Sequence, residues 1–320
     1  MAYSLKEIND AIRTDPKGFV EECDAAYNKK IENAAKKIAD NLVNSRIVLL
    51  SGPSGSGKTT TAKKIEAKLE EMGIQSHAIA MDDYFQTVDP ETAPRNREGQ
   101  IDYESPFCLD MDLLNRHFAL LDRGEKIHVP KYEFARQMRS AVHSKPLKLG
   151  KDEIAIFEGI HALNDIITGK NPAAMKLYIS ARSNVLDEEG KVAFKGTWMR
   201  LERRTVRDAK FRSWEPEVTV KMWANVRRGE KLYISPFKDN ANIQFDSSLP
   251  YEVSAIKPFA QPLFRDLHLD PAMERYEEIG HLVEAYPKFE TLDEKYVAGD
   301  SLLREFIGGG IMRINEGGTP

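Results

Sequence analysis

The feature that most constrains how this chain can fold is a strand, a glycine-rich loop and a helix in direct succession near residue 50. A short apolar run, 47–50, has the composition of a buried parallel strand. The loop at 52–59 reads GPSGSGKT and fits the pattern G-x-x-x-x-G-K-[ST]. The segment 60–72 then carries apolar residues at helical spacing. This succession predicts one unit of an α/β sheet built from parallel strands.

The loop has the residue types needed to bind phosphate groups. Glycines let the backbone curl so that its N–H groups converge on phosphate oxygens, and the following helix adds positive potential at its N-terminus. We expect Lys58 to reach the terminal phosphates of ATP and the Thr59 hydroxyl to bind Mg²⁺. A turn that only caps a helix is the alternative, which the match in pattern and context disfavours. The candidate ATP-binding residues here are Gly52, Pro53, Ser54, Gly55, Ser56, Gly57, Lys58, Thr59 and Thr60.

Strand and helix patterns continue to alternate along the chain. Further strands are predicted at 78–81, 154–157 and 177–179, and helices at 199–210 and 216–228. We therefore expect an α/β domain at 44–250, with a parallel sheet of about five strands and helices on both faces. A helical segment, 1–43, precedes this domain, and a helical extension, 251–320, follows it. The polar segment 88–100 is expected to be a mobile loop over the site.

Acidic residues follow two of the predicted strands. Asp82 and Asp83 come directly after 78–81, and Glu158 ends the apolar run 154–157. Ligands of parallel sheets gather at the carboxyl ends of the strands. Asp82 is therefore a candidate base for an acceptor hydroxyl, and Thr59, Asp82 and Glu158 are candidate Mg²⁺ ligands. The alternatives are that these acids only begin a turn or lie at a solvated strand end.

Arginines recur on one face of the predicted helix 199–210. Arg200, Arg203, Arg204 and Arg207 lie at i, i+3, i+4 and i+7, so this face is expected to be strongly cationic. Guanidinium groups suit bidentate contact with phosphate, and a lid bearing them can neutralise charge during phosphoryl transfer. A solvated charged face paired with nearby acids and an RNA-binding face are the two alternatives.

The composition of the chain limits which other classes of protein it can belong to. The chain has 320 residues, 41% of them hydrophobic and 30% charged, which allows a sizeable core. Its net charge of −4 disfavours binding of nucleic acid along its whole surface. Only two cysteines occur, Cys23 and Cys108, so neither a disulfide framework nor a zinc site is expected. No apolar run is long enough to cross a bilayer and no signal-peptide pattern is seen, which together predict a cytoplasmic protein.

In combination these motifs resemble the uridine kinase/phosphoribulokinase family of P-loop kinases. The matching stretches run in order over roughly 46–250: GPSGSGKTTTAKKI, MDDYF, DYESPFCLD, VPKYEF, IAIFEGIHAL and RLERRTVRD. The resemblance implies a P-loop NTPase fold and identifies Asp82 with the aspartate that acts on a sugar 5′-hydroxyl. It also matches Glu158 to a metal-associated acid, and Arg207 and Arg212 to lid arginines near the phosphates of ATP. The acceptor residues that it implies are Asp83, Phe85, Glu104, Tyr132 and Arg139.

The chain departs from typical uridine kinases at several of these positions. Gln137 stands where they carry a histidine that reads the pyrimidine, Trp214 replaces a second lid arginine, and an insertion occupies 180–199. The stretch 205–237 and the ending SLLREFIGG more closely resemble a bacterial subgroup of nucleoside kinases. Members of that subgroup often carry an N-terminal domain similar to those of threonyl-tRNA synthetases.

The predicted function is ATP-dependent phosphorylation of a small molecule, with the 5′-hydroxyl of a nucleoside as the favoured acceptor. Lys58, Asp82 and Arg207 are the candidate catalytic residues, and Arg212 and Gln137 complete the donor and acceptor sets. The alternatives are a phosphosugar, pantothenate or glycerate acceptor, or a non-catalytic, nucleotide-dependent RNA-binding regulator. A homo-oligomer is possible, with 1–44 and 251–320 as the expected partner surfaces.

Overall fold

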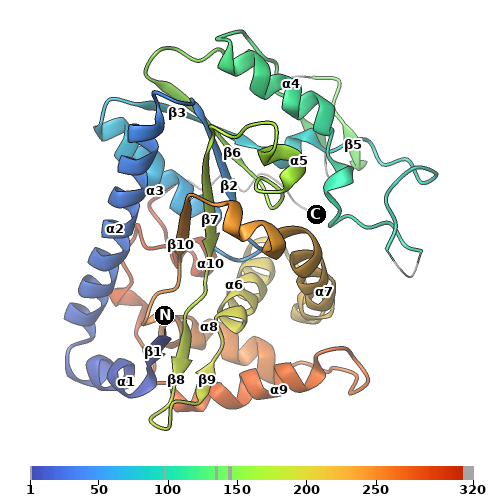
Figure 1. Ribbon diagram of the computed structural model, residues 1–320. Coiled ribbons are helices and arrows are strands. Elements are labelled where there is room, and N and C mark those ends of the chain that lie inside the picture. The colour runs from blue at the N-terminus through green and yellow to red at the C-terminus, as the bar shows by residue number, and fades with distance from the viewer. Residues whose placement is uncertain (1, 97–98, 134–135, 143–145, 313–320) are drawn as a thin grey trace.

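The structure is a computed structural model that describes residues 2–96, 99–133, 136–142 and 146–312. Its centre is a five-stranded sheet in the order β10-β7-β2-β6-β3, with every neighbouring pair parallel (Figure 1). The strands are β2 (Ile47–Ser51), β3 (Gln75–Ala80), β6 (Glu153–Glu158), β7 (Met175–Ser180) and β10 (Ile243–Asp246). The predicted α/β class with a parallel sheet is confirmed.

Alternate residues of the central strands divide the interior into two apolar clusters. In β2, Val48 and Leu50 belong to one cluster, while Ile47 and Leu49 belong to the other. Successive side chains of a strand point to opposite faces, so a wholly apolar run must be covered on both sides. Helices α2 (Pro16–Asn41) and α3 (Lys58–Glu71) cover the first face, and α4 (Met111–Asp122) and α5 (Asp165–Thr168) cover the second.

The N-terminal segment is attached to the rest of the protein by a second, smaller sheet. Strand β1 (Ala2–Ser4) pairs in parallel with β8 (Asn184–Leu186), which pairs antiparallel with β9 (Val192–Phe194). The insertion at 180–199 therefore contains a hairpin that receives the start of the chain. Helix α1 (Leu5–Thr14) follows β1, so the predicted helical segment is in fact a strand and two helices.

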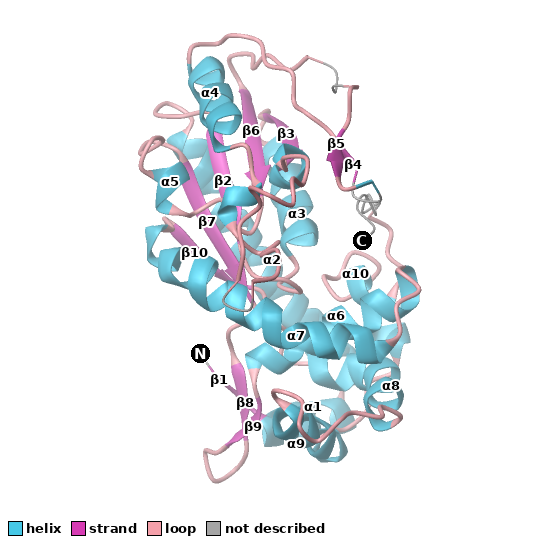
Figure 2. Ribbon diagram, turned by 90° about the vertical axis from the view of Figure 1, so that its right-hand side faces the viewer, coloured by secondary structure: helices cyan, strands magenta, loops and turns pink. Residues whose placement is uncertain are grey.

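Helices from the second half of the chain lie beneath the carboxyl ends of the sheet. Figure 2 shows α6 (Gly196–Phe211) and α7 (Pro216–Gly229) crossing below the central sheet, with the small sheet beyond them. After β10 come α8 (Glu252–Arg265), α9 (Tyr276–Ala285) and the short α10 (Arg304–Ile307). A minor antiparallel pair is formed by β4 (Tyr132–Glu133) and β5 (Met138–Arg139).

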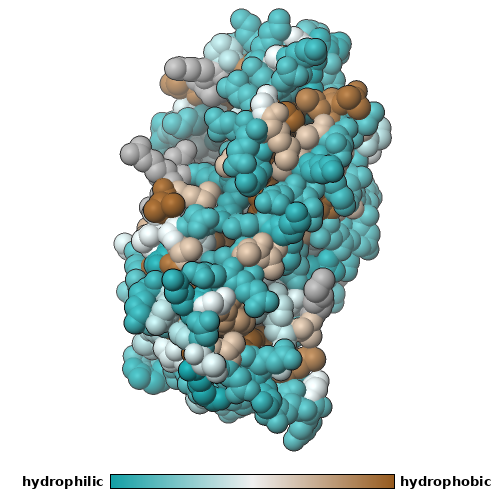
Figure 3. Space-filling view, turned by 90° about the vertical axis from the view of Figure 1, so that its left-hand side faces the viewer, coloured by the Kyte–Doolittle hydropathy of each residue, from teal (hydrophilic) through white to brown (hydrophobic). Residues whose placement is uncertain are grey.

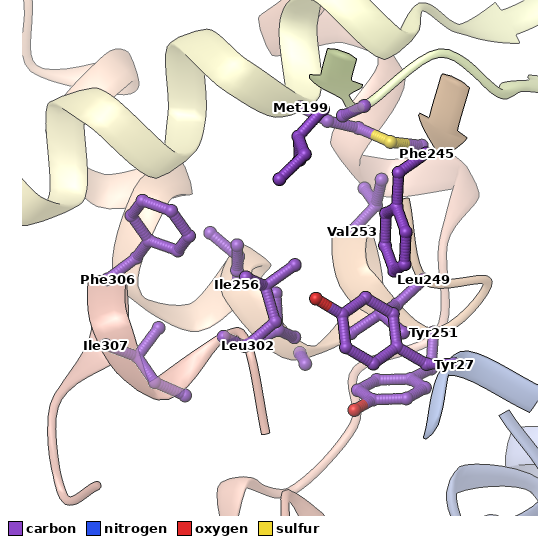
Figure 4. Packing of buried hydrophobic residues seen from close by; sticks show 14 of the residues in the cluster. Tyr27, Met199, Phe245, Leu249, Tyr251, Val253, Ile256, Leu302, Phe306 and Ile307 are labelled. Atoms are coloured by element: carbon purple, nitrogen blue, oxygen red, sulfur yellow. The ribbon is translucent and has the colours of Figure 1, made fainter. Parts of the chain in front are cut away.

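Both terminal segments share an apolar core with one face of the central sheet. Tyr27 of α2, Met199 of α6 and Phe306 of α10 all belong to it, and Figure 4 shows their side chains converging. The outer side of the molecule, next to α2, is mostly hydrophilic with scattered apolar residues (Figure 3). Among the described residues, no helix combines the length and apolar character needed to span a membrane.

Candidate active site

The loop between β2 and α3 has a shape that only glycine permits at two positions. Gly55 and Gly57 have φ angles of +72° and +77°, in the left-handed region. A Cβ atom on Gly57 would lie 2.3 Å from Cδ1 of Leu302, and one on Gly55 would lie 2.6 Å from the carbonyl oxygen of Arg200. The loop is therefore enclosed by α6 and by the segment that leads into α10. Its nine candidate residues run from the end of β2 into the first turn of α3.

Arginines of α6 hold the loop from outside. Arg200 Nη1 donates to the Ser54 carbonyl oxygen at 3.2 Å, and Arg203 Nη1 donates to that of Gly55 at 3.2 Å. Both guanidinium groups are paired with buried acids, Arg200 with Glu230 at 2.8 Å and Arg203 with Glu252 at 2.6 Å. Glu230 also pairs with Arg227. Their side chains are only 1% and 0% exposed. These two arginines fix the loop instead of presenting charge to a ligand.

The expectation of a cationic face made by all four arginines was therefore wrong for Arg200 and Arg203. Helical spacing indicates which residues share a face, but the acids that neutralise them come from distant parts of the chain. The cationic group that remains is centred on the buried Asp208. Its carboxylate lies 2.7 Å from Arg207 and 3.3 Å from both Arg204 and Arg212. Arg204 also interacts with Glu104, and Arg212 with Glu305. Arg207 and Arg212 are 17% and 31% exposed, so part of each side chain remains open to solvent.

The two predicted metal-site acids lie at adjacent strand ends. The register pairs Ala80 of β3 and Leu50 of β2 with Glu158, and Asp82 follows in a 3₁₀ turn, Met81–Tyr84. The residue Asp82 as a whole is exposed to solvent, but many protein atoms lie around its carboxyl group. Burial raises the pKa of Asp82 and of Glu158, and Lys58 opposes both rises. Burial in turn lowers the pKa of Lys58, which the same two acids oppose.

These groups fit a magnesium ion that is bound together with a phosphate ligand. Two carboxyl groups share one lysine, so their negative charge is only partly compensated. The described residues contain no group of three or more His, Cys, Asp or Glu side chains that could hold a metal. Mg²⁺ ordinarily binds through one or two carboxylates and the phosphates of a substrate, so this sparse donor set suits it.

Three of the six predicted acceptor residues line a cavity of about 540 Å³, and a fourth, Asp83, is hydrogen-bonded to one of them. The backbone N–H of Tyr132 donates to Asp83 Oδ1 at 3.4 Å, and the rings of Tyr132 and Phe85 are 5.5 Å apart. Phe85, Tyr132 and Gln137 line the cavity, with Gln137 at a φ of +50°. The segment 88–100 contributes Val88, Asp89, Thr92, Ala93 and Pro94 to the same wall. Trp214, Val218 and Met222 also line the cavity, and no lysine or arginine is among the described lining residues.

The other two predicted acceptor residues lie in different surroundings. Burial raises the pKa of Glu104, with Arg204 opposing the rise, and its Cβ packs against Gly229. Arg139 makes an internal clamp, because it binds Asp110 at 2.8 Å and donates to the carbonyl oxygens of Tyr84 and Phe85. Arg139 thus shapes the turn that carries Asp82, and contact with a substrate remains a prediction.

Three acids at the site were missed by sequence reasoning. Asp102 is bound by Arg228 at 3.0 Å and by the Tyr233 hydroxyl at 2.9 Å, which fixes the segment that carries Glu104. Asp208 pairs with the partly exposed Arg207, and the side chain of Glu305 contacts Thr60 in the first turn of α3. Asp102 and Asp208 fall inside stretches that matched the family, and Glu305 lies in the ending SLLREFIGG that resembled the bacterial subgroup, so motif membership was the available signal. Their partners were not predictable from it.

A parallel sheet with a phosphate-binding loop, acids at the strand ends and arginines on the following helix defines a P-loop kinase. Residues 47–253 match the model of the Phosphoribulokinase / Uridine kinase family, which is more than half of the chain, and the chain belongs to that family. It is accordingly a phosphotransferase that acts on an alcohol group.

The chain is similar to several individual proteins. A uridine kinase of Ureaplasma urealyticum is 27% identical over 198 residues, which cover 62% of this chain and 86% of the relative. One of Staphylococcus haemolyticus is 29% identical over 203 residues, covering 63% and 87%. Among solved structures, a D-glycerate 3-kinase from Cryptococcus neoformans matches with a TM-score of 0.45 and 15% identity, covering 66% of this chain and 89% of that one.

Proposed function

We propose that the protein transfers the γ-phosphoryl group of ATP to the 5′-hydroxyl of a nucleoside. The observation that carries this proposal is the cavity beside the turn of Asp82 and Asp83, which has aromatic and aliphatic walls. An aromatic base has the shape and polarity to fill such a space between Phe85, Tyr132 and Trp214. The names of the relatives from Ureaplasma and Staphylococcus support the same acceptor class.

On the donor side, the loop amides and Lys58 would hold the phosphates of ATP. Thr59, Asp82 and Glu158 would hold Mg²⁺, which when bound neutralises charge on the phosphate oxygens. The side chains of Arg207 and Arg212 are partly exposed, and together with Arg204 they share the carboxylate of Asp208. They would bind the γ-phosphoryl group as it leaves the β-phosphate.

On the acceptor side, Asp82 would accept the proton of the hydroxyl. As that oxygen bonds to the γ-phosphorus, the bond from the γ-phosphorus to the bridging oxygen breaks and ADP leaves. Much of the contribution of Asp82 would be orientation, because the phosphoryl transition state is loose. Glu104, beside the cavity and near Arg204, would bind the ribose hydroxyls.

The lining of the cavity gives less support to an anionic acceptor than to a nucleoside. Phosphosugars, glycerate and pantothenate all carry anionic groups, and a site for them needs lysine or arginine at the acceptor. The described lining of the cavity has neither. An RNA-binding regulator loses its main support, since Arg200 and Arg203 are buried and paired. Both cysteines are free, which supports a reducing compartment such as the cytoplasm.

A turnover panel tests the proposal directly. ADP formation would be measured with Mg²⁺ and ATP, using pyrimidine and purine nucleosides, ribulose 5-phosphate, glycerate and pantothenate as acceptors. We expect turnover with at least one nucleoside, and mass spectrometry should find the 5′-monophosphate. Turnover only with an anionic acceptor would contradict the nucleoside assignment. Salt-sensitive RNA binding without turnover on any acceptor would contradict the kinase assignment.

A further inference from the structure

The carboxylate of Glu305, near the C-terminal end of the described chain, binds the first turn of α3. Glu305 Oε2 accepts a hydrogen bond of 2.5 Å from the Thr60 hydroxyl and one of 3.3 Å from the Thr60 backbone N–H. Thr60 is the third residue of α3 and directly follows Lys58 and Thr59. A carboxylate from a distant segment therefore lies among the groups that the loop offers to phosphate.

The position occupied by Glu305 is one that attracts anions. The first N–H groups of a helix have no partner within the helix, and the helix dipole makes their surroundings positive. In loops of this pattern, such N–H groups bind the α- and β-phosphates of the nucleotide. The buried Ser56 hydroxyl, in the same loop, has no hydrogen-bond partner among the described residues. The loop is therefore arranged for an anionic ligand, and Glu305 takes two of its donors, both on Thr60.

The segment that carries Glu305 is firmly packed against the loop and α6. Leu302 lies against Gly57, and Phe306 is fully buried with the Arg203 guanidinium 5.3 Å from the centre of its ring. Figure 4 shows Leu302, Phe306 and Ile307 in the apolar core. Lys210 of α6 donates to the Ile307 carbonyl oxygen. Arg304 donates to four backbone carbonyl oxygens, those of Glu294, Val297, Ala298 and Gly308. This packing holds the Glu305 backbone in place, so the carboxylate contact is a defined part of the fold.

We propose that Glu305 is a donor-site residue that sets the affinity for ATP by competing with a phosphate group for Thr60. The inference rests on the proposed role of the loop in binding ATP. A phosphate oxygen and a carboxylate oxygen repel each other and both require the same N–H and O–H donors. Bound ATP therefore displaces the Glu305 side chain from Thr60, and part of the binding free energy is lost in doing so. Adenosine brings no anion to α3 and meets no such competition.

The test is calorimetric binding of ATP and of adenosine to Glu305→Gln, Glu305→Ala and the wild type. Removing the competing charge should lower the Kd of ATP by roughly 2- to 30-fold, which is the range for one charge at a helix terminus. The Kd of adenosine should stay the same. Glu284→Gln is the matched control, because it removes the same charge from an exposed position on α9 and should change neither Kd.

The outcomes separate the inference from the proposed function. Suppose that the wild type binds ATP and that Lys58→Ala does not. Unchanged or weaker ATP binding in Glu305→Gln would then overturn the proposed competition, while the role of the loop in binding ATP would stand. If neither the wild type nor Glu305→Gln binds ATP, the donor role and the inference fall together. Thermal melting shows which variants are folded, and if Glu305→Ala is not, the nearly isosteric Glu305→Gln decides alone.

Discussion

Replacing Glu252 by glutamine removes one negative charge from the fully buried pair that holds the phosphate loop. In the wild type both side chains of this pair, Arg203 and Glu252, are 0% exposed. Arg203 also donates to the carbonyl oxygens of Gly55, at 3.2 Å, and Ser247, at 3.0 Å. Glutamine preserves the size of the side chain, so the main change is an arginine charge that is buried without a counterion.

Breaking a buried ion pair from one side costs about 3–5 kcal/mol, because the remaining charge stays desolvated. For a chain of this length we take ~2 °C per kcal/mol, so the midpoint of thermal unfolding should fall by roughly 6–10 °C. The affinity for ATP should fall as well, since Arg203 would no longer hold the Gly55 carbonyl in one position.

Urea and thermal unfolding of Glu252→Gln and of Glu290→Gln measure this difference. Glu290 is the matched control, because it pairs with Arg13 at 2.7 Å on the surface, where the side chains are 41% and 56% exposed. An exposed pair of this kind contributes about 0–1 kcal/mol. If Glu252→Gln costs no more than Glu290→Gln, the buried pair does not hold the loop as described.

Two further predictions concern the interior and the acceptor cavity. Burial raises the pKa of Glu202 well above its ordinary value and Glu252 adds to the rise, so its protonated form is favoured in the folded state. This contribution to stability is complete below about pH 4.3 and is lost as pH rises, by about 1.4 kcal/mol per unit up to the folded pKa. In Glu202→Gln the Tyr286 hydroxyl keeps a hydrogen-bond acceptor. In urea unfolding between pH 5 and 8, the free energy of unfolding of this variant should therefore rise relative to that of the wild type as pH rises. A constant difference between the two proteins would contradict this prediction. Trp214→Ala should raise the KM for the nucleoside about tenfold through lost aromatic contact and leave that for ATP unchanged. Val192→Ala, on the distant β9, is the control and should change neither KM. Equal changes in both KM values of Trp214→Ala would contradict the placement of Trp214 in the wall of the acceptor cavity.

The part of the fold that the sequence predicts is the part whose signal is local. Each predicted strand overlaps an observed one, because the apolar runs are short, uninterrupted and followed by turn residues or acids. The helices at 199–210 and 216–228 lie within α6 and α7 for a similar reason. The fifth strand, β10, was expected in number but not located, since its Ile243–Asp246 run alternates apolar and polar residues over only four positions.

The parts that were missed depend on contacts between distant segments. The pairing of Ala2 with Asn184 joins β1 to the hairpin of the 180–199 insertion, and neither segment carries a signal for the other. The arginine periodicity of α6 was correct, but the acids facing Arg200 and Arg203 come from residues 230 and 252. The same limitation hid the contact of Glu305 with Thr60, which is separated from it by 245 positions.

The central claim is that Asp82 directs an acceptor hydroxyl at the phosphate that the loop holds. The most direct measurement is kcat for ADP formation with the preferred nucleoside, in the wild type and in Asp82→Asn, at saturating ATP and Mg²⁺. Loss of a general base typically lowers the rate by about 10²–10⁴-fold, and we expect a fall in this range with ATP still bound. A folded Asp82→Asn variant that turns over at the wild-type rate would contradict the account.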